Sequence, residues 1–241
     1  MPRPPDGQTP LRPGRRFYLC AHDARGRPLL PAPVIGIGTA SAIFGDLILI
    51  GYLIIVDDHF QLLPRARALL QETSSRGRPT AYTSLLHDLF RNPKVTVRGW
   101  TADLAPYAPH WIAHRLEAHG HVREVNHPRL LRRTPPRYEP VDRNAPNHLG
   151  DRLLLALSGR SSLTLLDMFE AGLLQATQLH RSRLASLPDL DDVIDHELRK
   201  LGTSELTPRT QSLCALLVPT RALATAATHS RTPADTNRIY V

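Results

Sequence analysis

The chain has 241 residues, of which 41% are hydrophobic and 22% charged, so it is large enough to bury a core as one large or two small domains. Lys and Arg number 30 against 22 Asp and Glu, which gives a net charge of +8, and nearly all of these cations are arginine. Two cysteines far apart in the sequence exclude a disulfide framework or a cysteine-based metal site and indicate a reducing compartment. An arginine-rich chain suits polyanionic partners, although a GC-rich genome produces the same bias.

The first 16 residues, MPRPPDGQTPLRPGRR, are rich in Pro and Arg, and we expect them to form a disordered arm. The segment has no apolar centre, so it is not a secretory signal peptide. One structured domain is expected over residues 17–228, and a flexible tail over residues 229–241.

The most apolar passage is VIGIGTASAIFGDLILIGYLIIV, residues 34–56, which is long enough to span a bilayer. Asp46 lies just past its middle, where an unpaired charge would be costly in lipid. Gly51 is a natural helix end, and β-type residues follow it. We therefore predict a buried helix over residues 35–50, followed by a β-hairpin that turns at Asp57-Asp58, and no transmembrane segment.

The rest of the chain predicts further helices and a second hairpin. Helices are expected within residues 64–80, 81–92, 96–106 and 109–120, with Leu85, Leu86, Leu89 and Phe90 on one side of the second of these. HVREV-NHP-RLLRR is predicted as strand, turn and strand, and TPPRYEPVDRNAPN as a Pro-rich connector. The last third reads as helices, with start signals at Ser161, Asp191 and Pro208. The fold class is therefore mainly α, a compact helical domain with one or two small β-hairpins.

Several segments resemble the Golgi phosphoprotein 3 family, particularly its bacterial branch. LCAHDARGRPLLP followed by GDLILIGYLIIVDD is similar to the family's opening turn, helix and strand, with Asp46 where Glu is usual and Tyr52 where Arg is usual. HRLEAHGHVREV and RYEPVDRNA resemble later segments, so the similarity covers residues 17–201 in order. The resemblance implies a mostly helical single domain with a hairpin used in self-association. Eukaryotic members are peripheral Golgi adaptors, not enzymes, that bind phosphatidylinositol 4-phosphate and glycosyltransferase tails.

The lipid pocket of the eukaryotic members does not carry over to this sequence. The positions of its Trp and three Arg residues align with Pro31, Ala40, Pro106 and Pro109. None of these supplies the cations or N–H donors that a phosphoinositide headgroup needs.

The strongest basic feature is RLLRRTPPRY, in which we predict a lipid-binding site formed by Arg129, Arg132, Arg133 and Arg137. Each basic residue near an anionic bilayer contributes about 1 kcal/mol, which predicts weak, salt-sensitive adhesion. The alternative is a solvated basic turn with two core leucines.

Other residue patterns give weaker signals. The apolar hairpin is a candidate oligomerisation edge, because exposed apolar strands pair readily. The residues predicted to make this contact are Leu53, Ile55, Phe60 and Leu62. His110 and His114 have the i, i+4 spacing of two metal ligands, but no third ligand has diagnostic spacing, so surface histidines are favoured and no metal is predicted. No nucleophile, base and oxyanion set is recognisable, so neither an enzyme nor a cofactor is expected.

Together these patterns predict a non-catalytic, cytoplasmic adaptor that adheres peripherally to anionic phospholipid headgroups on the cytosolic membrane face. Self-association and an unidentified protein client are further expected partners. Two alternatives stay open at this point. A winged-helix-like nucleic-acid-binding regulator also combines short helices with an Arg-bearing hairpin and a pI above about 9, although no helix has a polar recognition face. The other is a protein-interaction module without lipid binding.

Overall fold

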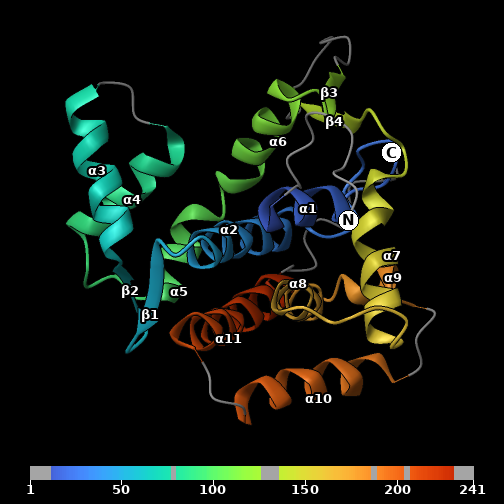
Figure 1. Cartoon of the computed structure of the whole chain (residues 1–241). Coiled ribbons are helices and arrows are strands. Elements are labelled where there is room, and N and C mark those ends of the chain that lie inside the picture. Colours follow the sequence, from blue (N-terminus) through green and yellow to red (C-terminus); the bar gives the residue numbers. More distant parts are fainter. Residues whose placement is uncertain (1–11, 77–79, 126–135, 186–188, 204–206, 231–241) are drawn as a thin grey trace, which may run out of the picture.

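The computed structural model describes residues 12–76, 80–125, 136–185, 189–203 and 207–230. This part of the chain is mainly helical, with eleven helices and two small antiparallel two-stranded sheets, which confirms the predicted fold class (Figure 1). The helices are α1 Pro13–Cys20, α2 Ala32–Leu49, α3 Pro64–Arg76, α4 Ala81–Arg91, α5 Val97–Leu104, α6 Ala108–Ala118, α7 Ala145–Leu157, α8 Leu165–Ala176, α9 His180–Arg183, α10 Leu190–Thr203 and α11 Pro208–His229. The strands are β1 Leu53–Val56, β2 His59–Leu62, β3 Val122–Val125 and β4 Arg137–Pro140.

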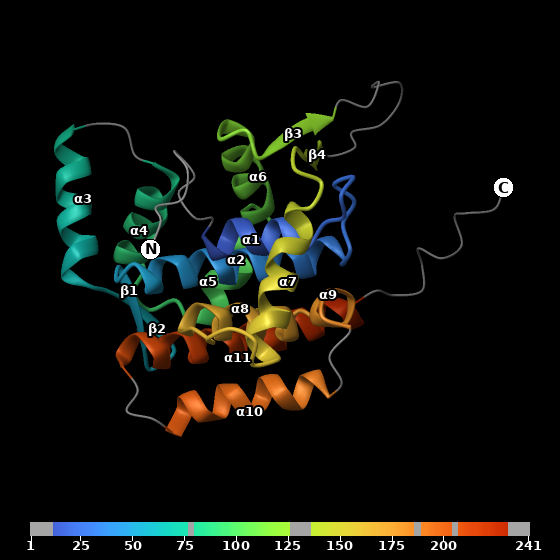
Figure 2. The ribbon, with the colours of Figure 1, turned by 45° about the vertical axis from the view of Figure 1, so that its right-hand side comes forward.

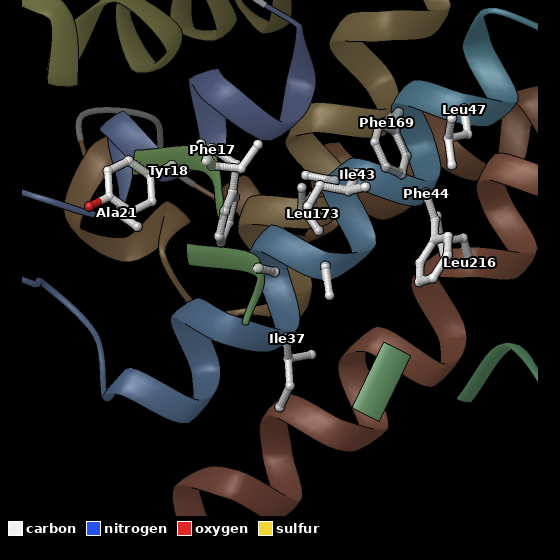
Figure 3. Close-up of a cluster of buried hydrophobic side chains, with 14 of the residues drawn as sticks. Phe17, Tyr18, Ala21, Ile37, Ile43, Phe44, Leu47, Phe169, Leu173 and Leu216 are labelled. Atoms are coloured by element: carbon white, nitrogen blue, oxygen red, sulfur yellow. The ribbon is translucent and has the colours of Figure 1, made fainter. Parts of the chain in front are cut away.

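Helix α2 lies at the centre of the molecule and is surrounded by α1, α5, α6, α8 and α11 (Figures 1 and 2). Its small residues let neighbouring aromatic rings approach the backbone. A Cβ atom at Gly38 would lie 2.1 Å from the Phe17 ring, and one at Gly45 would lie 2.3 Å from the Phe169 ring. Figure 3 shows side chains of α1, α2, α8 and α11 meeting in one apolar cluster. The all-round apolar sequence of α2 is thus explained by burial on every side.

In the described part of the chain, α2 is also the one helix long and apolar enough to cross a membrane, and 83% of its apolar window is buried inside the protein. It ends as the sequence predicts. Gly51 has a φ of +76°, and the Tyr52 N–H donates to the Leu47 carbonyl across the end of the helix. That bond and the left-handed glycine are the Schellman arrangement of a helix C-terminus.

The first predicted hairpin is present. Strand β1 pairs antiparallel with β2, and Asp57 and Asp58 form the turn with φ values of 48° and 60°. Two left-handed residues in a two-residue loop are typical of the tight turn that matches strand twist.

The second hairpin differs from the prediction. Strand β3 pairs with Arg137–Pro140, so Val125 faces Arg137, and the RYEP sequence assigned to a connector is a strand instead. The RLLRR segment predicted as that strand lies outside the described residues.

Three further details differ from the sequence-based expectations. Helix α1 begins at Pro13, inside the segment assigned to a disordered arm, and its first residues are buried against the core. Phe90 is 57% exposed, although Leu86 and Leu89 on the same helix are buried. The N-cap of helix α8 is Thr164, not Ser161, and Thr164 forms a capping box with Asp167.

Candidate functional site

The β3–β4 hairpin lies at one edge of the molecule, next to the end of α6 (Figure 1). Of the four arginines predicted to bind lipid, the structure places Arg137, whose guanidinium donates to Glu139 at 2.9 Å. Arg123 on β3 also approaches Glu139, at 3.4 Å. Arg129, Arg132 and Arg133 lie outside the described residues, in the segment of chain that joins β3 to β4. The structure therefore fixes the base of this hairpin and shows that the charge of Arg137 is shared with a carboxylate.

The apolar residues of the β1–β2 hairpin face the protein's own core. Leu53, Phe60 and Leu62 are buried, and Ile55 is partly buried against the same core. The outer edge of β1 is also occupied, since the Ile55 N–H donates to the Ser212 hydroxyl of α11 at 2.8 Å. The hairpin is thus not the exposed apolar edge that the sequence suggested, and self-association through it stays a prediction.

A group of arginines that the sequence analysis did not single out gathers at the start of α1. Arg12 caps α1, Arg15 lies one turn further on, and Arg115 comes from α6. Among the described residues none of the three forms an ion pair with a carboxylate; Arg115 instead stacks over the Tyr82 ring at 4.7 Å. Burial lowers the pKa of Arg15, and the neighbouring charges of Arg115 and Arg12 lower it further, while Tyr82 and Asp46 act in the opposite direction. These three arginines, hereafter the basic surface, therefore repel one another.

Close packing explains why the basic surface forms. A Cβ atom at Gly14 would lie 3.3 Å from both the Asp46 carboxylate of α2 and the Ile112 side chain of α6, so only glycine lets α1 approach both helices without displacement. Arg115 lies one turn after Ile112, and Arg15 directly follows Gly14. Arg15 is also close enough to His121, at the start of β3, to lower its pKa after burial has done so. The basic surface therefore adjoins the base of the β3–β4 hairpin.

Asp46 lies beneath the basic surface and is 1% exposed. Its Oδ2 accepts a hydrogen bond from the Tyr82 hydroxyl at 3.2 Å, and its Oδ1 has no hydrogen-bond partner among the described residues. Burial raises the pKa of Asp46 to about 7, against the opposing effects of Arg12, Tyr82 and Gly14. The carboxyl group thus lies beside the first turn of α1 in a place where burial disfavours its negative charge.

The opposite side of α1 carries a paired network. Arg16 donates to Glu170 of α8 at 3.0 Å, and Arg152 of α7 donates to Glu170 at 2.9 Å and also binds Asp167. Glu170 is 1% exposed, and burial raises its pKa to about 7 although Arg16 and Arg152 lower it. This buried network joins α1, α7 and α8. The adjacent residues Arg15 and Arg16 therefore have opposite surroundings.

The positions aligned with the eukaryotic lipid pocket lie at the start of α2, within α2, and around the start of α6. Helix α2 approaches the segment between α5 and α6 so closely that a Cβ atom at Gly36 would lie 2.4 Å from the Ala105 carbonyl oxygen. Ala40 is fully buried, and Pro31, Pro106 and Pro109 provide no charge or N–H donor. The structure thus supplies no cation at the four aligned positions.

Histidine and acidic side chains are the candidates for metal binding in the described ranges. No group of three or more His, Cys, Asp or Glu side chains there is arranged to hold a metal ion. Asp23 accepts from the backbone N–H groups of Arg25 and Arg27 at 2.8 Å, which is a turn-stabilising role.

These features define a helical domain with a buried apolar centre, two short hairpins and a basic end. A model of the Golgi phosphoprotein 3 (GPP34) family matches residues 14–209, which is most of the chain. The chain therefore belongs to the GPP34 family, as its sequence segments indicated. A search of curated proteins gave no match.

Proposed function

We propose that this GPP34 protein is a non-catalytic adaptor that adheres peripherally to an anionic phospholipid surface on the cytosolic side of a membrane. The contact would be made by the basic surface together with the hairpin arginines Arg129, Arg132, Arg133 and Arg137. The observation that carries the proposal is the group of three arginines, Arg12, Arg15 and Arg115, for which the described residues provide no ion-pair partner. Family membership supports the adaptor role.

Anionic lipid would relieve the repulsion within the basic surface. Each cation near such a bilayer contributes about 1 kcal/mol, so three contribute roughly 3 kcal/mol before the hairpin arginines are added. Attraction of this kind is screened over about 8 Å at physiological ionic strength, so the adhesion should weaken as salt is added. Arg137 should contribute less than the other hairpin arginines, because Glu139 offsets its charge.

Recognition by charge differs from recognition in a headgroup pocket. The positions aligned with the eukaryotic pocket hold Pro31, Ala40, Pro106 and Pro109, and these cannot select one phosphorylated headgroup. We therefore propose that phosphatidylinositol 4-phosphate is bound as one of several anionic lipids. A protein client and self-association, both typical of the family resemblance, belong to the same proposal.

Flotation with liposomes tests the lipid proposal. Vesicles of phosphatidylcholine alone, with phosphatidylserine, and with phosphatidylinositol 4-phosphate at matched charge would be compared at two salt concentrations. We expect binding to both anionic mixtures and none to phosphatidylcholine. The variant Arg129→Ser, Arg132→Ser, Arg133→Ser should bind weakly, whereas Arg91→Ser, Arg98→Ser, Arg160→Ser, which removes the same charge from exposed positions elsewhere, should bind normally.

A gel shift with random duplex DNA is the counter-test, because DNA also attracts cations in a salt-dependent way. Retention on DNA without flotation on anionic vesicles would overturn the proposal and favour a nucleic-acid-binding function. Light scattering over a range of concentrations tests self-association separately, and a monomer throughout would remove that part alone.

A further inference from the structure

Two histidines of α6 converge on one point at the surface. His110 and His114 are one helical turn apart and both exposed, and their Nε2 atoms lie 3.0 Å from each other. Their ring centroids are 4.3 Å apart, with the rings nearly perpendicular. The i, i+4 spacing brings any two such side chains near each other, and here it is the two Nε2 atoms that make the close approach.

Neighbouring groups hold His114 in this orientation. Its Nδ1 lies 3.6 Å from the Glu117 carboxylate, and Glu117 is itself anchored because its other oxygen accepts from the Glu124 N–H at 3.3 Å. The Tyr138 ring of β4 packs edge-on against the other side of His114. A carboxylate at Nδ1 favours the tautomer with the proton on Nδ1, which leaves the Nε2 lone pair free to bind.

The nitrogen separation selects a class of metal. With metal–nitrogen bonds of about 2.05 Å, two nitrogen atoms 3.0 Å apart subtend an angle of about 95° at the metal. That angle suits adjacent positions of a square-planar or octahedral ion, whereas a tetrahedral ion would need a separation of about 3.3 Å. Imidazole ligands in tetragonal geometry are typical of Cu²⁺ and Ni²⁺, and affinity peaks at Cu²⁺.

We propose that His110 and His114 form a two-histidine site for a divalent transition metal of the copper and nickel class. The remaining coordination positions are filled by solvent, because the described residues add no third ligand. The site is therefore exposed and exchangeable. His119 does not belong to it, since its Nδ1 is directed to the Arg115 carbonyl at 2.7 Å. The inference is independent of lipid adhesion.

The competing explanation is a direct hydrogen bond between the two neutral imidazoles, which the same 3.0 Å distance also permits. Titration of the untagged full-length protein with CuCl₂ at pH 7.5, followed by calorimetry and electron paramagnetic resonance, separates the two. We expect one equivalent bound with hyperfine coupling to two imidazole nitrogens. His110→Ala and His114→Ala should each weaken binding at least about tenfold and leave one coupled nitrogen.

His119→Ala is the matched control, because it removes a histidine from the same region without touching the pair, and it should leave binding unchanged. Circular dichroism would confirm that α6 stays folded in every variant. If the double variant His110→Ala, His114→Ala binds Cu²⁺ as tightly as the unchanged protein, or if the two-nitrogen coupling persists in it, the proposed site is wrong.

Discussion

Arg15 and Arg16 are neighbours in the sequence but belong to two different regions. Arg16 points inward to Glu170, in a network that also contains Arg152 and Asp167. Arg15 lies near Arg12 and Arg115, with no ion-pair partner among the described residues. The inner arginines pair with carboxylates, and the outer arginines of the basic surface do not. We therefore expect the inner arginines to stabilise the fold and the outer ones to be available to a ligand.

The difference follows from burial. A buried charge is costly unless a partner and hydrogen bonds compensate it. In the inner network Arg16 and Arg152 both pair with Glu170 Oε2, although Glu170 Oε1 accepts no hydrogen bond from the described residues. Arg15 and Arg115 are only partly buried, so they keep part of their hydration and their mutual repulsion costs little. Stability and adhesion should therefore respond to different arginines of the same short helix.

The largest expected effect comes from removing both cationic partners of Glu170. Replacing both Arg16 and Arg152 with Met leaves a carboxyl group that is 1% exposed without a cation. Removal of the partners of a buried charge typically costs about 3–5 kcal/mol, so the free energy of unfolding in urea at pH 8 should fall by that amount. The matched variant Arg15→Met, Arg115→Met should change it by less than about 1 kcal/mol. Equal losses in both variants would contradict the distinction between inner and outer charge.

The second effect is a pH dependence from Asp46. Its pKa is raised by burial from the model-peptide range to about 7, so the folded state holds the proton more tightly than the unfolded chain does. Its contribution to stability is therefore greatest at low pH and is lost as the pH rises from about 4 to 7, by a few kcal/mol. Asp46→Asn should remove this part of the slope when unfolding curves of the two proteins are subtracted. A difference curve that is flat or rises with pH would show that Asp46 is ionised in the fold.

The basic surface gives the next effect. Changing Arg12, Arg15 and Arg115 to Ser should weaken binding to phosphatidylserine vesicles by about 100-fold, because three contributions of about 1 kcal/mol are lost. The free energy of unfolding should stay the same or rise slightly, since like charges are removed. Flotation at low salt with urea unfolding of the same samples measures both. Normal flotation of the triple variant would show that the basic surface does not bind the vesicles and would assign adhesion to the hairpin arginines alone.

The smallest expected effect comes from an exposed apolar residue of α4, which we compare with a buried one. Phe90 is 57% exposed and Leu86 is fully buried, although both lie on one side of the helix. Phe90→Ser should change the free energy of unfolding by no more than about 0.5 kcal/mol, whereas Leu86→Ala should cost about 2–5 kcal/mol. A large loss in Phe90→Ser would mean that Phe90 is covered in solution, for instance by a second copy of the chain.

The sequence predicted the helices, strands and turns better than it predicted which residues contact one another. The end of α2 at Gly51 and the turn at Asp57-Asp58 were found because both positions need left-handed backbone conformations with recognisable residue preferences. The strand that pairs with β3 was predicted at RLLRR but lies at RYEP. Periodicity does not distinguish two candidate strands that are only four or five residues long.

The candidate site was harder to predict for a physical reason. Arg15 and Arg16 belong to the segment RPGRR, whose composition predicts a disordered arm. Only the packing of Gly14 against Asp46 and Ile112 shows that the segment is a buried part of α1. Arg115 is a single cation on a helix, and its meeting with α1 depends on contacts between residues a hundred positions apart. Local patterns give no signal for such contacts.

The most direct measurement compares Arg15→Ser with Arg16→Ser, which remove the same charge from adjacent positions. Liposome flotation and urea unfolding would be measured on both variants and the unchanged protein. We predict that Arg15→Ser weakens binding to anionic vesicles about fivefold, the equivalent of about 1 kcal/mol, without loss of stability. Arg16→Ser should lower the free energy of unfolding and leave the binding of the folded protein nearly unchanged. Equal effects of the two variants on both quantities would contradict the account.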